Sequence, residues 1–163
     1  MVVESNGVVK LYLVIGSDHA GYALKEHLKP IIAGWGYEVR DVGCYCEEPV
    51  DYPDIAEQVV LGIKDGQAEL GLLICGTGQG MAIAANKVPG IRAAVCNDEF
   101  SARAAREHND ATILAIGARV VGSGVAELIV KGFLESSYTG GRHQRRLDLI
   151  RSIENKYLKQ GEK

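Results

Sequence analysis

Residues 70–80, LGLLICGTGQG, place a reactive side chain beside a loop that can bind an anion. The apolar run ends at Cys75, and glycines then occupy alternate positions: Gly76, Gly78 and Gly80. Because glycine adopts dihedrals that other residues avoid, amide N–H groups of such a loop can turn toward an anion. A thiolate beside these donors, just before a helix, is suited to act as a nucleophile or a base. Thr77 adds a hydroxyl donor to the same loop.

Two other interpretations of this stretch remain open. Most unpaired cysteines are buried and inert, and Cys75 could be one of them. The glycines also resemble a dinucleotide-binding turn, and Asp98 imitates its ribose-binding acid. However, the fingerprint G-x-G-x-x-G requires glycine where the chain has Met81, and the loop follows the third predicted strand, not the first. A nucleotide-binding regulatory module is therefore the weaker alternative.

Two further stretches, REHND and GGRHQRR, carry imidazole and guanidinium groups. His108 titrates near neutral pH and is a candidate acid, although a histidine near a helix end is often a cap or surface residue. Positive charge at a helix N-terminus is unfavourable unless an anion lies nearby. Arg142 and Arg146 are four residues apart and share a helix face, so both can hold one phosphate. A solvated helix start is the alternative for this cluster.

Taken together, these groups fit proton abstraction next to a carbonyl of a small anionic substrate. That reaction needs a base, an acid and hydrogen-bond donors for the developing oxyanion. The thiol, the imidazole and the glycine-rich loop are those three parts.

The elements that must position these groups follow from periodicity and punctuation. Apolar runs predict strands at 11–17, 37–43, 70–75, 91–96 and 112–119. Helical spacing predicts helices at 20–33, 55–64, 81–88, 98–107, 123–135 and 144–158. Pro30 predicts a kink in the first helix or its early end.

Alternation of apolar strands with helices predicts a five-stranded parallel sheet covered on both faces. In such a sheet, ligands bind beyond the carboxyl ends of the strands, where strand order reverses. Asp18 and His19 follow the first strand, and Cys75 ends the third. If these two strands are neighbours, all three side chains face one cleft.

Composition indicates a single globular domain spanning 1–163, with 47% hydrophobic and 24% charged residues. No apolar stretch approaches the roughly 18 to 20 residues of a membrane span, and the N-terminus does not resemble a signal peptide. We therefore expect a cytoplasmic protein with reduced cysteines. Cys44 and Cys46 form C-x-C, which is not the usual zinc spacing. The net charge of −3 argues against general nucleic-acid binding.

Six stretches together resemble type B ribose-5-phosphate isomerase, of the family that also contains the galactose-6-phosphate isomerase subunits. They are GSDHAG, DYPD, ICGTGQG, AANKVPGIRAA, EHNDATILAIGAR and GGRHQRR, between about residues 11 and 155. The resemblance implies a Rossmann-like three-layer α/β/α sandwich with no metal or organic cofactor. It also implies a homodimer or dimer of dimers whose site lies between subunits, with helix 144–158 at the interface. Residues 1–10 are an N-terminal extension relative to this pattern.

The resemblance also assigns roles to individual residues. Cys75 matches the proton acceptor, and His108 matches the proton donor linked to opening of the sugar ring. With Thr77 and Asp18 they form the expected catalytic set. The expected substrate and phosphate contacts are Asp18, His19, Gly76, Thr77, Gly78, Gln79, Gly80, Asn109, Arg119, Arg142 and Arg146.

The implied activity is interconversion of ribose 5-phosphate and ribulose 5-phosphate through a cis-enediol, in the non-oxidative pentose phosphate pathway. A six-carbon sugar phosphate, such as allose or galactose 6-phosphate, is the alternative within the family. The sequence does not decide between them, because pocket depth depends on how subunits meet. No nucleic-acid or membrane partner is expected.

Overall fold

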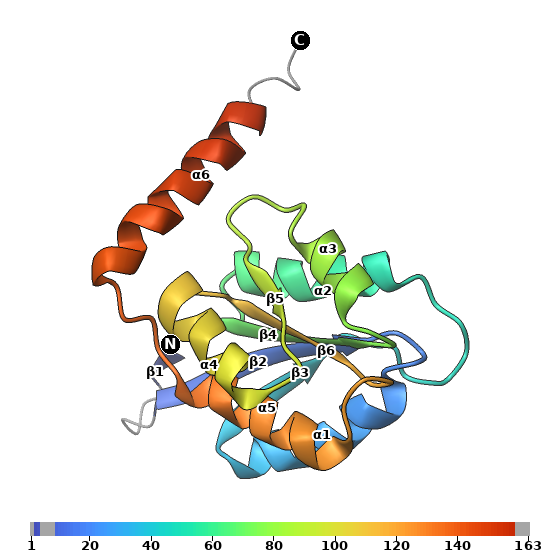
Figure 1. Cartoon of the computed structure of the whole chain (residues 1–163). Helices are drawn as coiled ribbons and strands as arrows, with labels where there is room; N and C mark the ends of the chain where they lie inside the picture. The colour runs from blue at the N-terminus through green and yellow to red at the C-terminus, as the bar shows by residue number, and fades with distance from the viewer. Residues whose placement is uncertain (1, 4–8, 159–163) are drawn as a thin grey trace.

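The structure, a computed structural model, describes residues 2–3 and 9–158 (Figure 1). Five strands are parallel: β2 (Val9–Ser17), β3 (Tyr37–Asp41), β4 (Leu70–Cys75), β5 (Ala93–Val95) and β6 (Ile113–Gly117). A two-residue strand, β1 (Val2–Val3), pairs antiparallel with β2. The helices are α1 (Tyr22–Gly34), α2 (Tyr52–Lys64), α3 (Gln79–Ala85), α4 (Glu99–Asn109), α5 (Ser123–Glu135) and α6 (Gln144–Leu158).

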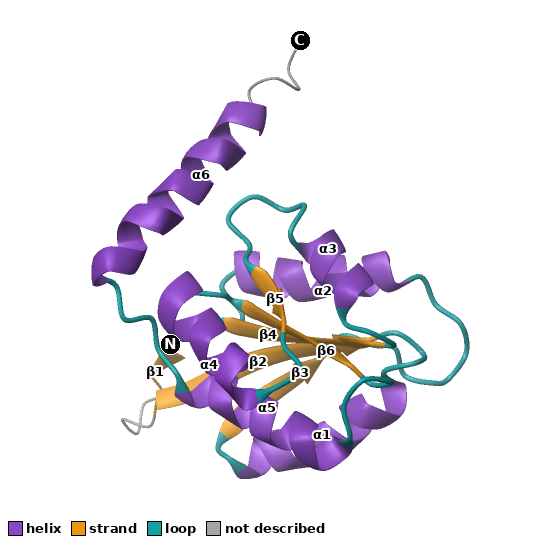
Figure 2. Ribbon diagram, in the orientation of Figure 1, coloured by secondary structure: helices purple, strands orange, loops and turns teal. Residues whose placement is uncertain are grey.

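Helices cover both faces of the sheet, as Figure 2 shows. Apolar residues of α1, α4 and α5 form one buried cluster, and those of α2 and α3 form the other. Successive residues of β4 belong alternately to the two clusters. Leu72 and Ile74 belong to the first cluster, and Leu73 and Cys75 belong to the second. The predicted three-layer α/β/α sandwich with five parallel strands is confirmed.

The parallel strands run in the order β3, β2, β4, β6, β5 across the sheet. From β2 the chain crosses through α1 to β3 on one side, whereas β4 lies on the other side. Strand order therefore reverses between β2 and β4, which are the strands predicted to be neighbours. This is the place where a parallel sheet binds ligands.

Three local predictions need correction. Helix α1 does not end early at Pro30 but continues to Gly34, because Leu28 and Ile32 are fully buried and their burial offsets the lost backbone bond. Helix α2 begins three residues earlier than predicted, with Pro53 in its first turn, where the missing N–H costs nothing. The first long strand, β2, begins at Val9, two residues earlier than predicted. Within the predicted extension 1–10, residues 2–3 form the edge strand β1, and residues 1 and 4–8 lie outside the described residues.

Helix α6 projects from the body of the molecule (Figure 1). Leu147 is its buried residue, and Glu154 accepts a hydrogen bond from the Gly90 amide at 2.9 Å. A stripe of apolar side chains along this helix stays exposed: Leu149 (56%), Ile150 (48%), Ile153 (60%) and Tyr157 (62%). Such a stripe is unusual on a solvated helix.

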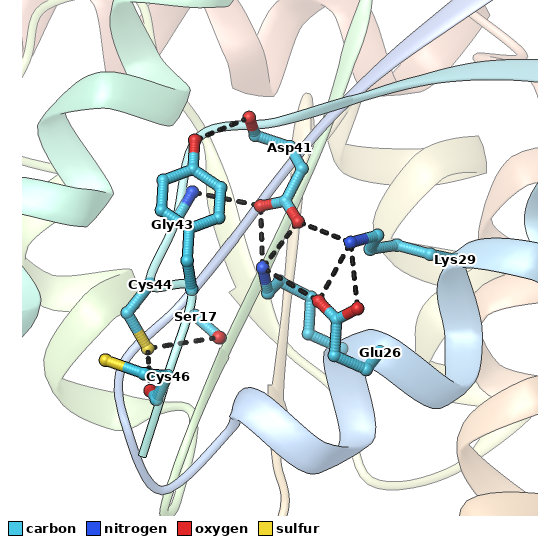
Figure 3. A network of polar contacts seen from close by, with 9 residues as sticks. Ser17, Glu26, Lys29, Asp41, Gly43, Cys44 and Cys46 are labelled. Carbon is cyan, nitrogen blue, oxygen red and sulfur yellow. Dashed lines mark hydrogen bonds and ion pairs between the residues drawn. The ribbon is translucent and has the colours of Figure 1, made fainter. Parts of the chain in front are cut away.

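A charge network ties α1 to the end of β3 (Figure 3). The Lys25 side chain is completely buried, and its Nζ donates to both carboxylate oxygens of Asp41, at 2.7 and 2.6 Å. Asp41 also accepts from Lys29 at 2.7 Å and from the Gly43 amide at 2.9 Å. Burial alone would raise the pKa of Asp41, but the hydrogen bonds from Lys25, Lys29 and Gly43 lower it overall. The pKa of Lys29 rises to about 12, chiefly through its bond to Asp41.

Among the residues that the structure describes, no helix is both long and apolar enough to cross a bilayer.

Asp41→Asn should destabilise the protein by about 3 to 5 kcal/mol, because it leaves the buried Lys25 without its main counter-ion. Lys29→Met removes a partly exposed cation from the same carboxylate and should cost about 1 kcal/mol or less. Urea unfolding of the two variants measures the difference. Because the folded pKa of Asp41 lies below 3.8, the loss should persist above that pH and shrink below it. Equal losses for both variants would contradict the assignment.

Candidate active site

The carboxyl ends of β2 and β4 bring the first predicted residues together. Ser17 pairs with Ile74 in the parallel register, and the Asp18 amide donates to the Ile74 carbonyl at 3.1 Å. Asp18 is therefore the first residue after β2, beside Cys75 at the end of β4. The predicted juxtaposition of these two side chains at one edge follows from this register.

Backbone contacts orient Asp18 and His19. The Asp18 carboxylate is buried, and its Oδ1 accepts from the Gly21 amide at 3.0 Å. His19 Nδ1 accepts from the Val50 amide at 3.4 Å. Since Nδ1 is the acceptor, Nε2 carries the proton of the neutral ring. The loop between β3 and α2 therefore sets which nitrogen of His19 can donate to a ligand.

Cys75 differs from the other cysteines in what its sulfur contacts. Cys75 is 4% exposed, and the Gly78 amide donates to its Sγ at 3.1 Å. Gly78 has φ +78°, a conformation that turns this N–H toward the sulfur and that other residues rarely adopt. A donor aimed at the sulfur stabilises negative charge there. By contrast, burial and Asp98 raise the pKa of Cys96 to about 11, and Cys44 donates to the Cys46 carbonyl.

Glycines in the loop 76–80 and in β6 let the loop pack closely against the end of the sheet. A Cβ at Gly117 would lie 2.8 Å from the carbonyl carbon of Thr77, and one at Gly80 would lie 2.8 Å from Tyr52 Cζ. Thr77 Oγ1 accepts from the Gln79 amide at 3.4 Å, within the loop. The position of Thr77 thus depends on glycine in the neighbouring strand.

Arg119 places a cation over the start of this loop. Its amide donates to the Gly76 carbonyl at 3.0 Å, and a Cβ at Gly76 would lie 3.6 Å from the Arg119 side chain. The Arg119 residue itself is exposed. The edge therefore offers backbone N–H groups, a thiol and a guanidinium to one anionic ligand.

The remaining predicted residues form a second group around the end of α4. His108 and Asn109 belong to its last turn, and the His108 ring stacks on His143 of the 3-10 turn Gly141–His143. Arg142, Arg145, Arg146 and Leu149 line an adjoining pocket of about 530 Å³. Within the described chain, none of these three arginines pairs with a carboxylate. The pocket is therefore strongly positive and open to an anion.

The two groups lie at opposite edges of the sheet. Strands β5 and β6 are parallel and α4 connects them, so α4 must run back from the carboxyl edge to the amino edge. Its 11 residues span about 16 Å at 1.5 Å per residue. Within one chain, therefore, His108, Asn109, Arg142 and Arg146 do not join Cys75.

Two residues outside the predicted set take part in these arrangements. Tyr52 packs its ring against Gly80 and lines a pocket of about 440 Å³ beside the loop. His143 is buried against His108. Both lie in the motifs DYPD and GGRHQRR, but nothing in their local spacing distinguishes them from turn residues. No group of three or more metal-ligating side chains gathers within residues 2–3 and 9–158.

Comparison with known proteins shows which family the chain belongs to. A model of the family described as Ribose/Galactose Isomerase matches residues 13–150. The chain belongs to the ribose/galactose isomerase family. It is 46% identical over 144 residues to ribose-5-phosphate isomerase B of Escherichia coli, covering 88% of this chain and 97% of the relative.

Solved structures of isomerases in this family share the fold. Ribose-5-phosphate isomerase B from Clostridium thermocellum has a TM-score of 0.88 and 51% identity, covering 90% of this chain and 99% of its own. The enzyme from Mycoplasma genitalium with bound ribulose 5-phosphate has a TM-score of 0.84 and 39% identity, covering 89% and 97%. The Rossmann-like fold inferred from the resemblance is thus confirmed for this isomerase.

Gly117→Ala should displace Thr77 and lower isomerase turnover at least tenfold, because its Cβ would meet loop backbone that cannot swing aside. The variant should also lose about 1 to 3 kcal/mol of stability. Gly124→Ala is the matched control, since nothing lies within 4 Å of the added Cβ. Steady-state kinetics and urea unfolding measure both effects. Unchanged turnover in Gly117→Ala would show that this close approach does not position the loop.

Proposed function

We propose that this isomerase interconverts ribose 5-phosphate and ribulose 5-phosphate through a cis-enediol. The observation that carries the proposal is Cys75, whose sulfur accepts an N–H bond at the edge where strand order reverses. Relatives named ribose-5-phosphate isomerase B, one of them with bound ribulose 5-phosphate, support the choice of substrate.

In this proposal Cys75 removes the proton from C2 of the open aldose and returns it to C1. The sulfur lies beside loop 76–80, where the Gly78 N–H donates to it and stabilises the thiolate that acts as the base. Thr77, Gly76, Gly78, Gln79 and Gly80 stabilise the enediolate. Asp18 and His19 bind sugar hydroxyls, and Arg119 lies over the loop to balance negative charge.

His108 is the proposed acid for opening the furanose ring. Ribose 5-phosphate is mainly cyclic in water, whereas ribulose 5-phosphate cannot form that ring, so the aldose alone needs an opening step. Asn109 contacts the sugar beside it. Arg142 and Arg146 hold the phosphate in the positive pocket, where bidentate contacts fix its orientation.

A second copy of the chain completes the site in this proposal. Cys75 and His108 lie at opposite edges of one sheet, so one molecule cannot apply both to the same sugar. The exposed apolar stripe of α6 is suited to an interface. Arg142 lies in the 3-10 turn just before α6, and Arg146 lies in the first turn of α6. We therefore propose a homodimer or dimer of dimers with shared sites and α6 at the subunit interface.

The remaining expectations stay predictions: a cytoplasmic location, a single domain over 1–163, the non-oxidative pentose phosphate pathway, and no metal, organic cofactor or nucleic-acid partner. Side-by-side assays with ribose 5-phosphate, allose 6-phosphate and galactose 6-phosphate test the sugar length. A higher kcat/KM for a six-carbon sugar would replace the proposed substrate.

Cys75→Ala should lower kcat by more than about 100-fold, the loss typical of removing a general base. Cys46→Ala, at an exposed cysteine, should keep wild-type turnover. Cys46→Ala should unfold at the wild-type temperature, and Cys75→Ala should stay folded but unfold slightly lower, because it loses a buried sulfur and its hydrogen bond. Wild-type activity should survive EDTA. If Cys75→Ala keeps more than a tenth of kcat, another group is the base.

Mixing Cys75→Ala with Arg142→Ala subunits should restore activity if subunits exchange. In a mixed dimer, one of the two shared sites then has both an intact thiol and an intact phosphate pocket. Subunits carrying two different affinity tags allow mixed dimers to be isolated and assayed. Each variant assayed alone is the control and should stay nearly inactive, because every site of a Cys75→Ala dimer lacks the thiol and every site of an Arg142→Ala dimer lacks Arg142. No recovery in verified mixed dimers would place both residues in one subunit's own site.

A further inference from the structure

His143 is a buried imidazole without a role in the proposed reaction. It is 8% exposed, and its ring lies parallel to that of His108, with centroids 4.4 Å apart and planes 6° apart. The two residues come from segments 35 positions apart in the chain. Because stacking restricts rotation about the side-chain bonds, each ring limits how the other can turn.

The backbone around His143 is tied to the helix end that carries His108. The amide and hydroxyl of Thr139 both donate to the Glu107 carbonyl, at 3.0 and 2.8 Å. Gly140 and Gly141 then adopt positive φ values of 65° and 57°, which turn the chain into the 3-10 helix. The stack is thus supported from both sides, by the last turn of α4 and by a glycine turn anchored to it.

Burial and the charges around His143 favour the neutral form of its ring. Burial lowers its pKa from the ordinary 6.5, and the positive fields of His108, Arg142 and Arg146 lower it further. Arg142 Nε donates to His143 Nε2 at 3.4 Å, so this nitrogen is the unprotonated one. A neutral ring can stack on His108 whether or not His108 carries a proton, whereas two imidazolium rings at 4.4 Å would repel.

We infer that His143 is a positioning residue for His108: its stacked ring holds the imidazole of His108 in the orientation that protonates the ring oxygen of the sugar. This inference rests on the proposed function, because it assigns a support to the acid of that reaction. It also links the acid to the phosphate pocket, since Arg142 contacts the same ring.

Two substitutions separate the stacked ring from its nitrogen atoms. His143→Phe keeps a flat neutral ring without nitrogen, and His143→Gln keeps a polar side chain without a ring. His27→Gln removes an exposed histidine bonded to Glu127 and serves as the control. Thermal unfolding of each variant monitors the fold.

The first measurement needs no substrate. In wild type, NMR should show cross-peaks between the His108 and His143 rings, with His108 assigned from the spectrum of His108→Asn. The His108 ring signals should move in His143→Gln and keep an upfield ring-current shift in His143→Phe. Absence of the cross-peaks in wild type would overturn the stack whatever the variants do.

The second measurement compares the two directions of the reaction at rising enzyme concentration. Starting from the aldose, the rate of His143→Gln should level off at uncatalysed ring opening, as that of His108→Asn should, while the rate from the ketose keeps rising in proportion. His143→Phe, His27→Gln and wild type should stay linear in both directions.

Linear behaviour of His143→Gln in both directions would overturn the inference. If His143→Phe and His143→Gln level off alike, a nitrogen of His143 is needed and stacking alone is not its role. A wild type that isomerises no sugar phosphate would defeat the proposed function instead, and the NMR comparison would still decide whether His143 holds His108.

Discussion

The parallel direction of the strands is the constraint on which this molecule depends. It brings the ends of β2, β4 and β6 to one edge, so the thiol, the glycine loop and Arg119 follow from adjacent strands. The same rule sends every connecting helix back to the other edge, and α4 takes His108 with it. One topological rule therefore brings one group of the proposed site residues together and places the other group at the opposite edge.

Close backbone approach is the second requirement of the site. Strand β6 can touch the loop because Gly117 has no side chain, and the Gly78 N–H can reach the sulfur because glycine tolerates positive φ. At the end of the neighbouring strand β3, the buried Lys25–Asp41 pair fixes the start of the loop between β3 and α2. The same loop contains Val50, whose amide orients His19. Loop geometry here is set by contacts with fixed elements on each side.

The features that could be predicted from the sequence are those that depend on neighbouring residues in the chain. Cys75 and its loop follow from an apolar run and spaced glycines, and the strand edges follow from periodicity. Lys25 could not be predicted as buried, because a lysine on an amphipathic helix is usually solvated and its partner Asp41 lies in another element. The His108–His143 stack depends on a turn that folds back onto α4, and no local sequence pattern predicts that contact. The separation of His108 from Cys75 needed the direction of α4 relative to the sheet.

The exposed apolar stripe on the projecting helix α6 has a consequence for how activity depends on protein concentration. If two copies share each site, a lone chain has a thiol without a phosphate pocket and a phosphate pocket without a thiol. Specific activity would then fall on dilution, by mass action, once the subunits separate. A substrate that contacts two chains would oppose their dissociation, so added sugar phosphate would stabilise the dimer in a dilute preparation. The apolar stripe of α6 would thereby set the lowest protein concentration at which the enzyme works.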